Sequence, residues 1–395
     1  MNVKFSTKFV AASAAAVMAL SLAGCSSGSM DDSSSSSAKA SGDSITIGTV
    51  TTNSGTAAAY GEAEVKGFEL AVSEINAKGG INGKKVKLES MDDKGDATEA
   101  SNAFNKLAGD NNVLAVAGPT ISATTAAVAP LADQSKLVTI APAATSDSIE
   151  TGNYLFRTCF KDSYQGEIAA KFAAETLKVK KVAVLYGTGD PYSSGVGEAF
   201  AKAAEKLGLE VVDKESSSSA DDTEYSAQLQ KIQASGAELL YAPYYYSVAG
   251  PYIIPQARSV GFEGYVMGPD GYDGLKLTGD KSQYNKTYYT THYSADDNTN
   301  TKVQDFIKSY KSKNNAEPNT FAALGYDTIY MIKQAIEKAG KNATREDVRN
   351  AVASMTFDGV TGKFTMDKSG SPTKSVIVLE MKDGKPVYNT TVQPK

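Results

Sequence analysis

The residues best suited to bind a charged small molecule follow short apolar runs that are typical of strands. Residues 118–125 leave such a run and enter a predicted helix, with Ser122 near its start. Free N–H groups and hydroxyls at a helix start attract a carboxylate. Residues 142–145 follow the next run, and their small side chains, Ala143 among them, let the backbone approach a ligand closely. Ordinary helix capping by the hydroxyls is the alternative interpretation of the first segment.

An acid and several tyrosines follow other predicted strands. Asp270, in the sequence Gly268-Pro269-Asp270-Gly271, can supply an anion, although Pro-Asp-Gly is also typical of a plain turn. A tyrosine offers a flat apolar face and a hydroxyl, which suits a cleft as well as a core. We expect at least three of the tyrosines at corresponding loops of the two halves to contact a ligand. These are Tyr60, Tyr192, Tyr244, Tyr245, Tyr246 and Tyr272.

The sequence lacks the motifs of the common enzyme classes. Its single histidine, His292, has no Gly-x-Ser-x-Gly elbow to accompany it, so a Ser-His-Asp triad is not expected. Gly187-Thr188-Gly189 lacks the third glycine of a dinucleotide fingerprint, and no Walker sequence occurs. A hydrolase or an oxidoreductase would need one of these devices. We therefore expect a protein that is not an enzyme and carries no cofactor.

Metal and nucleic-acid sites are not expected either. Two cysteines and one histidine cannot build a cysteine-rich or histidine-rich metal site. The acids Asp92, Asp93, Asp96 and Glu99 lack the spacing of an EF-hand and are expected on a solvated surface. His292 is expected at the surface or near a hinge. The chain has 40 basic and 45 acidic residues, a net charge of −5, and no basic run that suits nucleic acid.

The N-terminus is typical of a bacterial lipoprotein signal. Lys4 and Lys8 precede an apolar run over residues 9–22, which is too short to span a bilayer as a helix. The run ends in Leu22-Ala23-Gly24-Cys25, which resembles the lipobox of bacterial lipoproteins. The sequence therefore predicts a signal peptide over residues 1–24.

The residues that follow the signal peptide predict a membrane anchor. The thiol of Cys25 is expected to carry a lipid, and the Ser-rich residues 25–44 are expected to form a flexible tether. Cys159 is then the only remaining thiol, and it is expected to be a small buried residue.

The rest of the chain alternates strands and helices twice, and a length of 395 residues predicts two domains. Such alternation predicts parallel sheets covered by helices on both faces. The predicted strands are residues 45–50, 86–88, 113–118, 137–140, 182–186, 210–212, 238–242 and 375–381. The predicted helices include residues 68–77, 97–107, 194–207, 224–234, 326–339 and 345–354, and another begins near Ser122. Residues 288–395 are too few for a third domain and are expected to complete both lobes.

Over about residues 45–385 the sequence resembles the bacterial leucine/isoleucine/valine-binding proteins, the substrate-binding components of ABC transporters. The most recognisable piece is Glu74-Ile75-Asn76-Ala77-Lys78-Gly79-Gly80-Ile81-Asn82-Gly83. The other matching segments are Tyr60-Gly61, residues 142–145, Gln256-Ala257-Arg258, residues 267–271 and Gly325-Tyr326-Asp327. In combination these segments are specific for the family and much less so for the ligand.

The resemblance implies a type I periplasmic-binding-protein fold with two Rossmann-like lobes, three hinge crossovers and a cleft. Lobe 1 would comprise residues 45–161 and 292–366, and lobe 2 residues 162–291 and 367–395. The ligand carboxylate would meet Ser122, Ala143 and Thr145, and the ammonium would meet Asp270 and the backbone carbonyl of Ala143. Aromatic residues would form the side-chain pocket: Tyr60, Tyr192, Tyr245 and Phe321. Phe321 is implied by the resemblance alone.

The resemblance further implies a lipid-anchored importer component outside the cytoplasmic membrane or in the periplasm. It would act as a monomer that captures leucine, isoleucine or valine and delivers the amino acid to membrane permease subunits. Two features depart from the best-known members: Asp270 replaces a glutamate, and Gly95 and Ile121 replace the cysteines of a disulfide. The abundance of tyrosine leaves a second ligand class open, namely an aromatic amino acid, an aromatic carboxylate or an amide such as urea.

Overall fold

The computed structural model describes residues 44–149, 153–296 and 301–394. The predicted signal peptide, Cys25 and all of the predicted tether except Ser44 lie outside these ranges. Ser44 itself begins the first strand and is not part of a tether. Within the described ranges, no helix combines the length and apolar character needed to cross a bilayer.

The first sheet contains five parallel strands in the order β2-β1-β3-β4-β5. These strands are β1 (Ser44–Thr51), β2 (Lys85–Asp92), β3 (Val113–Ala117), β4 (Val138–Ala141) and β5 (Leu155–Arg157). Every residue of β3 and β4 is buried, as expected for central strands that are covered on both faces.

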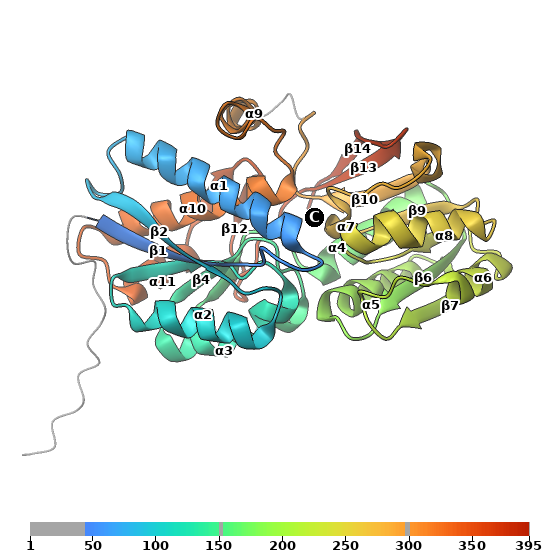
Figure 1. The fold of residues 1–395 in the computed structure, drawn as a ribbon, viewed down its shortest axis with the longest axis horizontal. Coiled ribbons are helices and arrows are strands. Elements are labelled where there is room, and N and C mark those ends of the chain that lie inside the picture. Colours follow the sequence, from blue (N-terminus) through green and yellow to red (C-terminus); the bar gives the residue numbers. More distant parts are fainter. Residues whose placement is uncertain (1–43, 150–152, 297–300, 395) are drawn as a thin grey trace, which may run out of the picture. The chain divides into compact units, whose positions relative to one another are not determined.

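Helices cover both faces of the first sheet (Figure 1). One face carries α1 (Ala58–Ala77), α10 (Thr320–Ala339) and α11 (Arg345–Ala353), which share one apolar core with the sheet. The opposite face carries α2 (Ala97–Gly109) and α3 (Ser122–Ser135) over a separate core. Helices from the last quarter of the sequence therefore pack on the first sheet.

The second sheet repeats this topology and then extends it. The order β7-β6-β8-β9-β10 matches the order of the first sheet, and these five strands are parallel. They are β6 (Lys181–Gly187), β7 (Glu210–Ser217), β8 (Leu239–Tyr241), β9 (Tyr265–Gly268) and β10 (Thr287–Thr291). The same order in both sheets confirms the α/β prediction of two Rossmann-like lobes.

Both sheets are mostly parallel, and the end of the chain adds two antiparallel strands to the second sheet. Here β13 (Val376–Lys382) pairs antiparallel with β10, and β14 (Lys385–Val392) pairs antiparallel with β13. The turn between them is Asp383-Gly384, with φ of 50° and 76°. Two consecutive residues at positive φ form a tight hairpin turn, which reverses the chain without a crossover helix.

The helices of the second lobe also form two layers. On one face α4 (Asp162–Glu175) packs against α5 (Pro191–Lys206), and on the other lie α6 (Ser226–Ala234) and α8 (Ile254–Ser259). Short helical segments connect the strands: α7 (Tyr246–Val248), the π-helical η2 (Ala249–Ile253), and the 3-10 turns η3 (Asp270–Tyr272) and η4 (Lys281–Tyr284). The turn η1 (Asp147–Ile149) belongs to the first lobe.

The chain passes between the two sheets three times. It crosses between β5 and α4, between β10 and α10, and between the hairpin β11 (Thr356–Gly359) and β12 (Gly362–Thr365) and strand β13. Helix α9 (Thr301–Asn314) lies within the second of these connections and contacts α1. The lobe boundaries after residues 161, 291 and 366 stay predictions.

Candidate ligand-binding site

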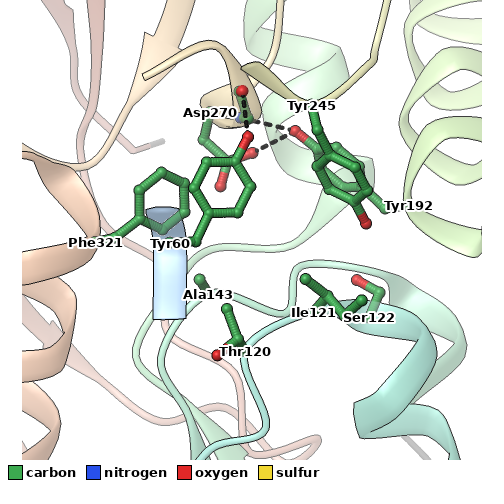
Figure 2. A pocket seen from close by; sticks show the side chains of 10 residues that line it. Tyr60, Thr120, Ile121, Ser122, Ala143, Tyr192, Tyr245, Asp270 and Phe321 are labelled. Carbon is green, nitrogen blue, oxygen red and sulfur yellow. Dashed lines mark hydrogen bonds between the residues drawn. The ribbon is translucent and has the colours of Figure 1, made fainter. Parts of the chain in front are cut away.

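A small hollow lies at the carboxyl ends of strands from both sheets, and Figure 2 shows its lining. Ten residues line it: Tyr60, Thr120, Ile121, Ser122, Ala143, Tyr192, Tyr245, Asp270, Gly271 and Phe321. Its cavity volume of about 10 Å³ is the space of roughly one water molecule. Seven of the eight predicted binding residues are therefore brought together, and Thr145 is the exception.

The start of α3 supplies a hydroxyl to the hollow. Ser122 is buried, and its Oγ accepts a hydrogen bond from the backbone N–H of Ser146 at 3.1 Å. Because that bond uses a lone pair, the hydroxyl proton of Ser122 stays available for an acceptor such as a carboxylate. The loop that leads to Ser122 begins at Gly118 (φ 122°), where a Cβ would lie 2.0 Å from the carbonyl oxygen of Val50. Only glycine fits this close approach.

The neighbouring loop is held from behind by an arginine. Arg157 is buried, and its guanidinium donates to the carbonyl oxygens of Thr145 at 2.7 Å and Ser146 at 3.0 Å. Thr145 is fully buried behind Ala143 and does not line the hollow. Its Oγ1 has no hydrogen-bond partner among the described residues. The role of Thr145 toward a carboxylate stays a prediction.

Asp270, in the turn η3 after β9, faces the hollow from the second lobe. Its Oδ1 accepts hydrogen bonds from the hydroxyl of Tyr192 at 2.9 Å and from Nε2 of Gln165 at 3.2 Å. Its Oδ2 lies 3.2 Å from Nε2 of His292. A carboxylate oxygen accepts about two hydrogen bonds, so Oδ1 is saturated and Oδ2 retains room for one more donor.

His292 is buried rather than at the surface, which corrects one sequence-based alternative. It follows β10, is 2% exposed, and its ring stacks on Phe160 with a centroid distance of 3.6 Å. Burial lowers the pKa of His292 to about 4; the charge of Lys374 acts in the same direction, and the bond to Asp270 opposes both. The imidazole is therefore neutral at pH 7, and Nε2 carries the proton that it shares with Asp270.

Aromatic rings form the rest of the wall. Tyr60 stacks on Phe321 at a centroid distance of 3.9 Å, and Tyr192 stacks on Tyr245 at 5.3 Å with nearly parallel planes. Burial raises the pKa of the hydroxyls of Tyr60, Tyr192 and Tyr245 well above the ordinary value, so each remains a protonated donor. Three of the six tyrosines expected at the site therefore line the hollow, and their contact with a ligand stays a prediction.

The local position of the tyrosines differs from the sequence prediction. Tyr60 and Tyr192 lie in the first turns of α1 and α5, not in loops. Helix α5 starts early because Pro191 suits the first position and the side chain of Asp190 caps the N–H of Tyr192. Tyr244 and Tyr272 turn into the core of the second lobe. Only part of the predicted tyrosine cluster therefore reaches the hollow.

Hydrogen bonds join the two lobes beside the hollow. The hydroxyl of Tyr60 donates to the carbonyl oxygen of Gly271 at 2.5 Å and accepts from the N–H of Tyr246 at 3.0 Å. The hydroxyl of Ser247 donates to the carbonyl oxygen of Thr56 at 2.7 Å. These bonds hold residues of the first lobe against residues of the second, which describes a closed cleft.

Of the four acids expected on a solvated surface, three are exposed, namely Asp92, Asp96 and Glu99, and one is not. Asp93 is buried and accepts from the hydroxyl of Thr52 at 2.6 Å and the N–H of Gly95 at 2.9 Å. Glu64 is also buried; its Oε2 accepts from the hydroxyl of Thr120 at 2.6 Å, and burial raises the pKa of its carboxyl well above the usual range. The hydroxyl of Thr120 is thereby held away from the ligand side of the hollow.

Sequence reasoning missed four residues at or beside the hollow. Thr120 and Ile121 lie inside the segment 118–125, and Gly271 lies inside the segment 268–271. Both segments were predicted to contact a ligand, so the position of these three residues in the sequence could have identified them as lining residues. Gln165 carried no such signal, because α4 is rich in alanine and lacks a clear apolar stripe. Cys159 is buried, as expected. In the described part of the chain, no group of three or more potential metal ligands comes together.

Comparisons with known proteins agree with this architecture. Residues 44–386 match the family model described as "Periplasmic binding protein". The chain is 30% identical to "Leu/Ile/Val-binding protein homolog 3" of Brucella melitensis, over 86% of this chain and 92% of the relative.

Solved structures show the same fold. The branched-chain amino acid transporter substrate binding protein LivJ from Streptococcus pneumoniae, in complex with isoleucine, is 32% identical with a TM-score of 0.82, covering 89% of this chain and 100% of that one. A solute binding protein from R. palustris in complex with benzoate has a TM-score of 0.78 at 22% identity, covering 89% and 97%, and shares the fold. The chain therefore belongs to the Leu/Ile/Val-binding group of the periplasmic binding protein family, the substrate-binding proteins of ABC transporters, which are transport receptors and not enzymes.

Proposed function

We propose that this protein captures a zwitterionic α-amino acid with an aliphatic side chain, namely leucine, isoleucine or valine, between its lobes. The observation that carries the proposal is the pairing of Ser122 and Asp270 in one hollow. Ser122 offers a hydroxyl proton to a carboxylate, and Asp270 offers one open position on Oδ2 to an ammonium group. The names of the relatives support the same ligand class.

The surrounding rings favour an apolar side chain. Tyr60, Tyr245 and Phe321 present ring carbon to the hollow, and the hydroxyl of Thr120 is tied to Glu64. An aliphatic group loses contact with water there and leaves no buried polar atom unpaired.

Binding requires the lobes to separate first. A cavity of about 10 Å³ cannot admit leucine, and the interlobe bonds of Tyr60 and Ser247 block entry. The amino acid would enter an open form and favour a closed form in which it contacts both lobes, with some outward shift of the aromatic rings. The closed form would then present a joint surface of both lobes to the permease subunits of the transporter.

The cellular setting that we propose follows from the N-terminal sequence. A lipid on Cys25 and the Ser-rich tether would hold the receptor at the outer face of the membrane while the lobes remain free to meet a permease.

The proposal is tested by identifying the ligand. Native mass spectrometry of the purified protein should show a bound mass of leucine, isoleucine or valine. A thermal-shift screen should give the largest rise in melting temperature with the same amino acids. If only ligands without an α-ammonium group raised the melting temperature, the proposal would fail.

One alternative is an aromatic ligand, and the stacked tyrosines favour it. An aromatic amino acid, an aromatic carboxylate or an amide such as urea could contact Tyr60 and Tyr245 after the lobes open; in the closed form their rings meet edge to face at 5.8 Å. A carboxylate or an amide would place no cation against Asp270, which would leave a buried carboxylate without a counter-charge. Benzoate, phenylalanine and urea therefore belong in the thermal-shift screen beside leucine.

A further inference from the structure

The side chain of Gln165 makes four hydrogen bonds beside the site. It lies in the first turn of α4 and is completely buried. Its Nε2 donates to Oδ1 of Asp162 at 2.9 Å and to Oδ1 of Asp270 at 3.2 Å. Its Oε1 accepts from the backbone N–H of Asp270 at 3.3 Å and from the hydroxyl of Thr290 at 3.1 Å. Both ends of the amide are therefore saturated, and two of the four bonds go to Asp270.

These bonds fix Asp270 in two ways at once. One bond holds its carboxylate and the other holds its backbone, so the side chain can neither swing away nor shift with the turn η3. An amide is the group that can do this, because it carries donors and acceptors on one planar unit. A carboxylate at position 165 could not donate to Oδ1, and an apolar side chain could do neither.

The same network reaches the opposite end of the hollow. The backbone N–H of Asp162 donates to the carbonyl oxygen of Thr145 at 2.9 Å, the oxygen that also accepts from Arg157. A continuous path of hydrogen bonds thus runs from the loop at residues 143–146 through Asp162 and Gln165 to Asp270. The path crosses the first connection between the lobes, since Thr145 follows β4 and Asp162 begins α4.

We propose that Gln165 is a positioning residue that holds the Asp270 carboxylate at a set separation from the carboxylate-binding loop. Its function would be to select ligands whose ammonium and carboxylate groups stand on the same carbon atom. The inference rests on the proposed function, since it concerns how an α-amino acid is recognised. Gln165 itself does not line the hollow and acts through Asp270.

The test replaces Gln165 with methionine, which is similar in length but lacks the amide. Calorimetry would give the affinities of three ligands: leucine, its β-amino isomer 3-amino-4-methylpentanoate, and the amine-free 4-methylpentanoate. In the wild type, leucine should bind at least 100-fold more tightly than the other two. Gln165→Met should bind leucine at least tenfold more weakly than the wild type does. The ratio of the Kd of each analogue to the Kd of leucine should also fall at least tenfold.

A matched control distinguishes a positioning role of Gln165 from the general effect of removing a buried bridging amide. Gln256 is also a bridging amide, with Oε1 accepting from the N–H of Tyr225 at 2.7 Å and Nε2 donating to the carbonyl oxygen of Thr223 at 2.8 Å, but it lies away from the hollow. Gln256→Met should leave the preference for leucine unchanged. Thr290→Val, which removes one bond to Gln165 and keeps the side-chain shape, should show a smaller contraction and covers the case in which Gln165→Met does not fold.

The outcomes are distinguishable. A wild-type protein that binds no amino acid would refute the proposed function, and the inference with it. If the wild type binds leucine but Gln165→Met and Thr290→Val keep the wild-type preference, or lose affinity for all three ligands equally, the positioning role is wrong and the proposed function stands.

Discussion

Tyr60 in the first lobe and Gly271 in the second are joined by a hydrogen bond of 2.5 Å from the tyrosine hydroxyl to the glycine carbonyl oxygen. Gly271 directly follows Asp270, so the bond lies beside the acid that we assign to the ligand ammonium. The same hydroxyl accepts from the N–H of Tyr246. The hydroxyl of Tyr60 therefore joins two segments of the second lobe to α1. Because one of these segments follows Asp270 directly, closure of the cleft also fixes the position of the turn that carries Asp270.

Tyr60→Phe should open the cleft of the ligand-free protein. The change removes the two hydrogen bonds that the Tyr60 hydroxyl makes with the second lobe and keeps the ring that stacks on Phe321. The loss of these bonds should raise the free energy of the closed form by about 1–3 kcal/mol. Small-angle X-ray scattering should record a larger radius of gyration without ligand and the wild-type value with saturating leucine. Tyr284→Phe is the control, because that hydroxyl bonds only within the second lobe, to Gly250 and Thr278. Identical scattering of Tyr60→Phe and wild type would show that the hydroxyl of Tyr60 does not hold the cleft closed.

Ser122→Ala should weaken leucine binding. The loss of a hydroxyl that donates to a carboxylate costs about 1.5–3 kcal/mol, or roughly 10- to 100-fold in Kd. Calorimetry measures this directly. Ser135→Ala, at the other end of α3, removes a hydroxyl that donates to the carbonyl oxygen of Leu131 and should leave the Kd unchanged. Equal affinities of Ser122→Ala and the wild type would remove Ser122 from the site.

Asp270→Asn should nearly abolish leucine binding. The variant keeps the side-chain shape but leaves the ligand ammonium buried without a counter-charge, which costs about 3–5 kcal/mol, or more than 100-fold in Kd. Asp327→Asn serves as the control: Asp327 is a buried acid that accepts from the N–H groups of Val360 and Thr361, away from the hollow. That control should lower the melting temperature and spare the affinity. If Asp270→Asn instead lowered the melting temperature and kept the affinity for leucine, Asp270 would have a structural role only.

His292 should make folding stability depend on pH below neutrality. Because burial lowers the pKa of folded His292 to about 4, the unfolded chain, with an ordinary value near 6.5, takes up a proton that the folded protein refuses between these pH values. Stability from this residue is therefore complete above pH 6.5 and is lost as the pH falls toward 4, by roughly 3 kcal/mol.

His292→Gln keeps an N–H for Asp270 and cannot take up the proton. Urea unfolding of the wild type and the variant should give a difference in unfolding free energy that grows from pH 4 to pH 6.5 and is constant above. Glu64 and Asp162, whose pKa values burial raises well above the usual range, titrate in both proteins and cancel in this difference. A difference that stays constant across the whole range would contradict a buried neutral His292.

Much of the fold and part of the site could be predicted from local sequence because they depend on short segments. Parallel strands bring their carboxyl ends to one edge of a sheet, so the segments containing Ser122 and Ala143, which follow strands of the first sheet, had to lie close together. Asp270 follows a strand of the second sheet, and only the family resemblance implied that it faces them across a cleft. Phe321 came only from the family resemblance, since nothing in its own segment distinguishes it from a core residue.

What could not be predicted depends on contacts between distant segments. His292 reads as an isolated polar residue, and only the packing of Phe160 and the turn η3 around it makes it a buried partner of Asp270. Asp93 reads as one of several surface acids, but Thr52 and Gly95 bury it. The antiparallel pairing of β13 with β10 follows from the route of the third crossover, which no local pattern specifies. The pairing of β14 with β13, in contrast, follows from the local turn Asp383-Gly384.

The most direct test of the whole account is a calorimetric comparison of leucine with its two half-molecules, 4-methylpentanoate and 3-methylbutylamine, on the unmodified protein at pH 7. If Ser122 and Asp270 each bind one charged end of a single ligand, leucine should bind at one site per chain and at least 100-fold more tightly than either half-molecule. A half-molecule that binds within tenfold of leucine would contradict this account of the site.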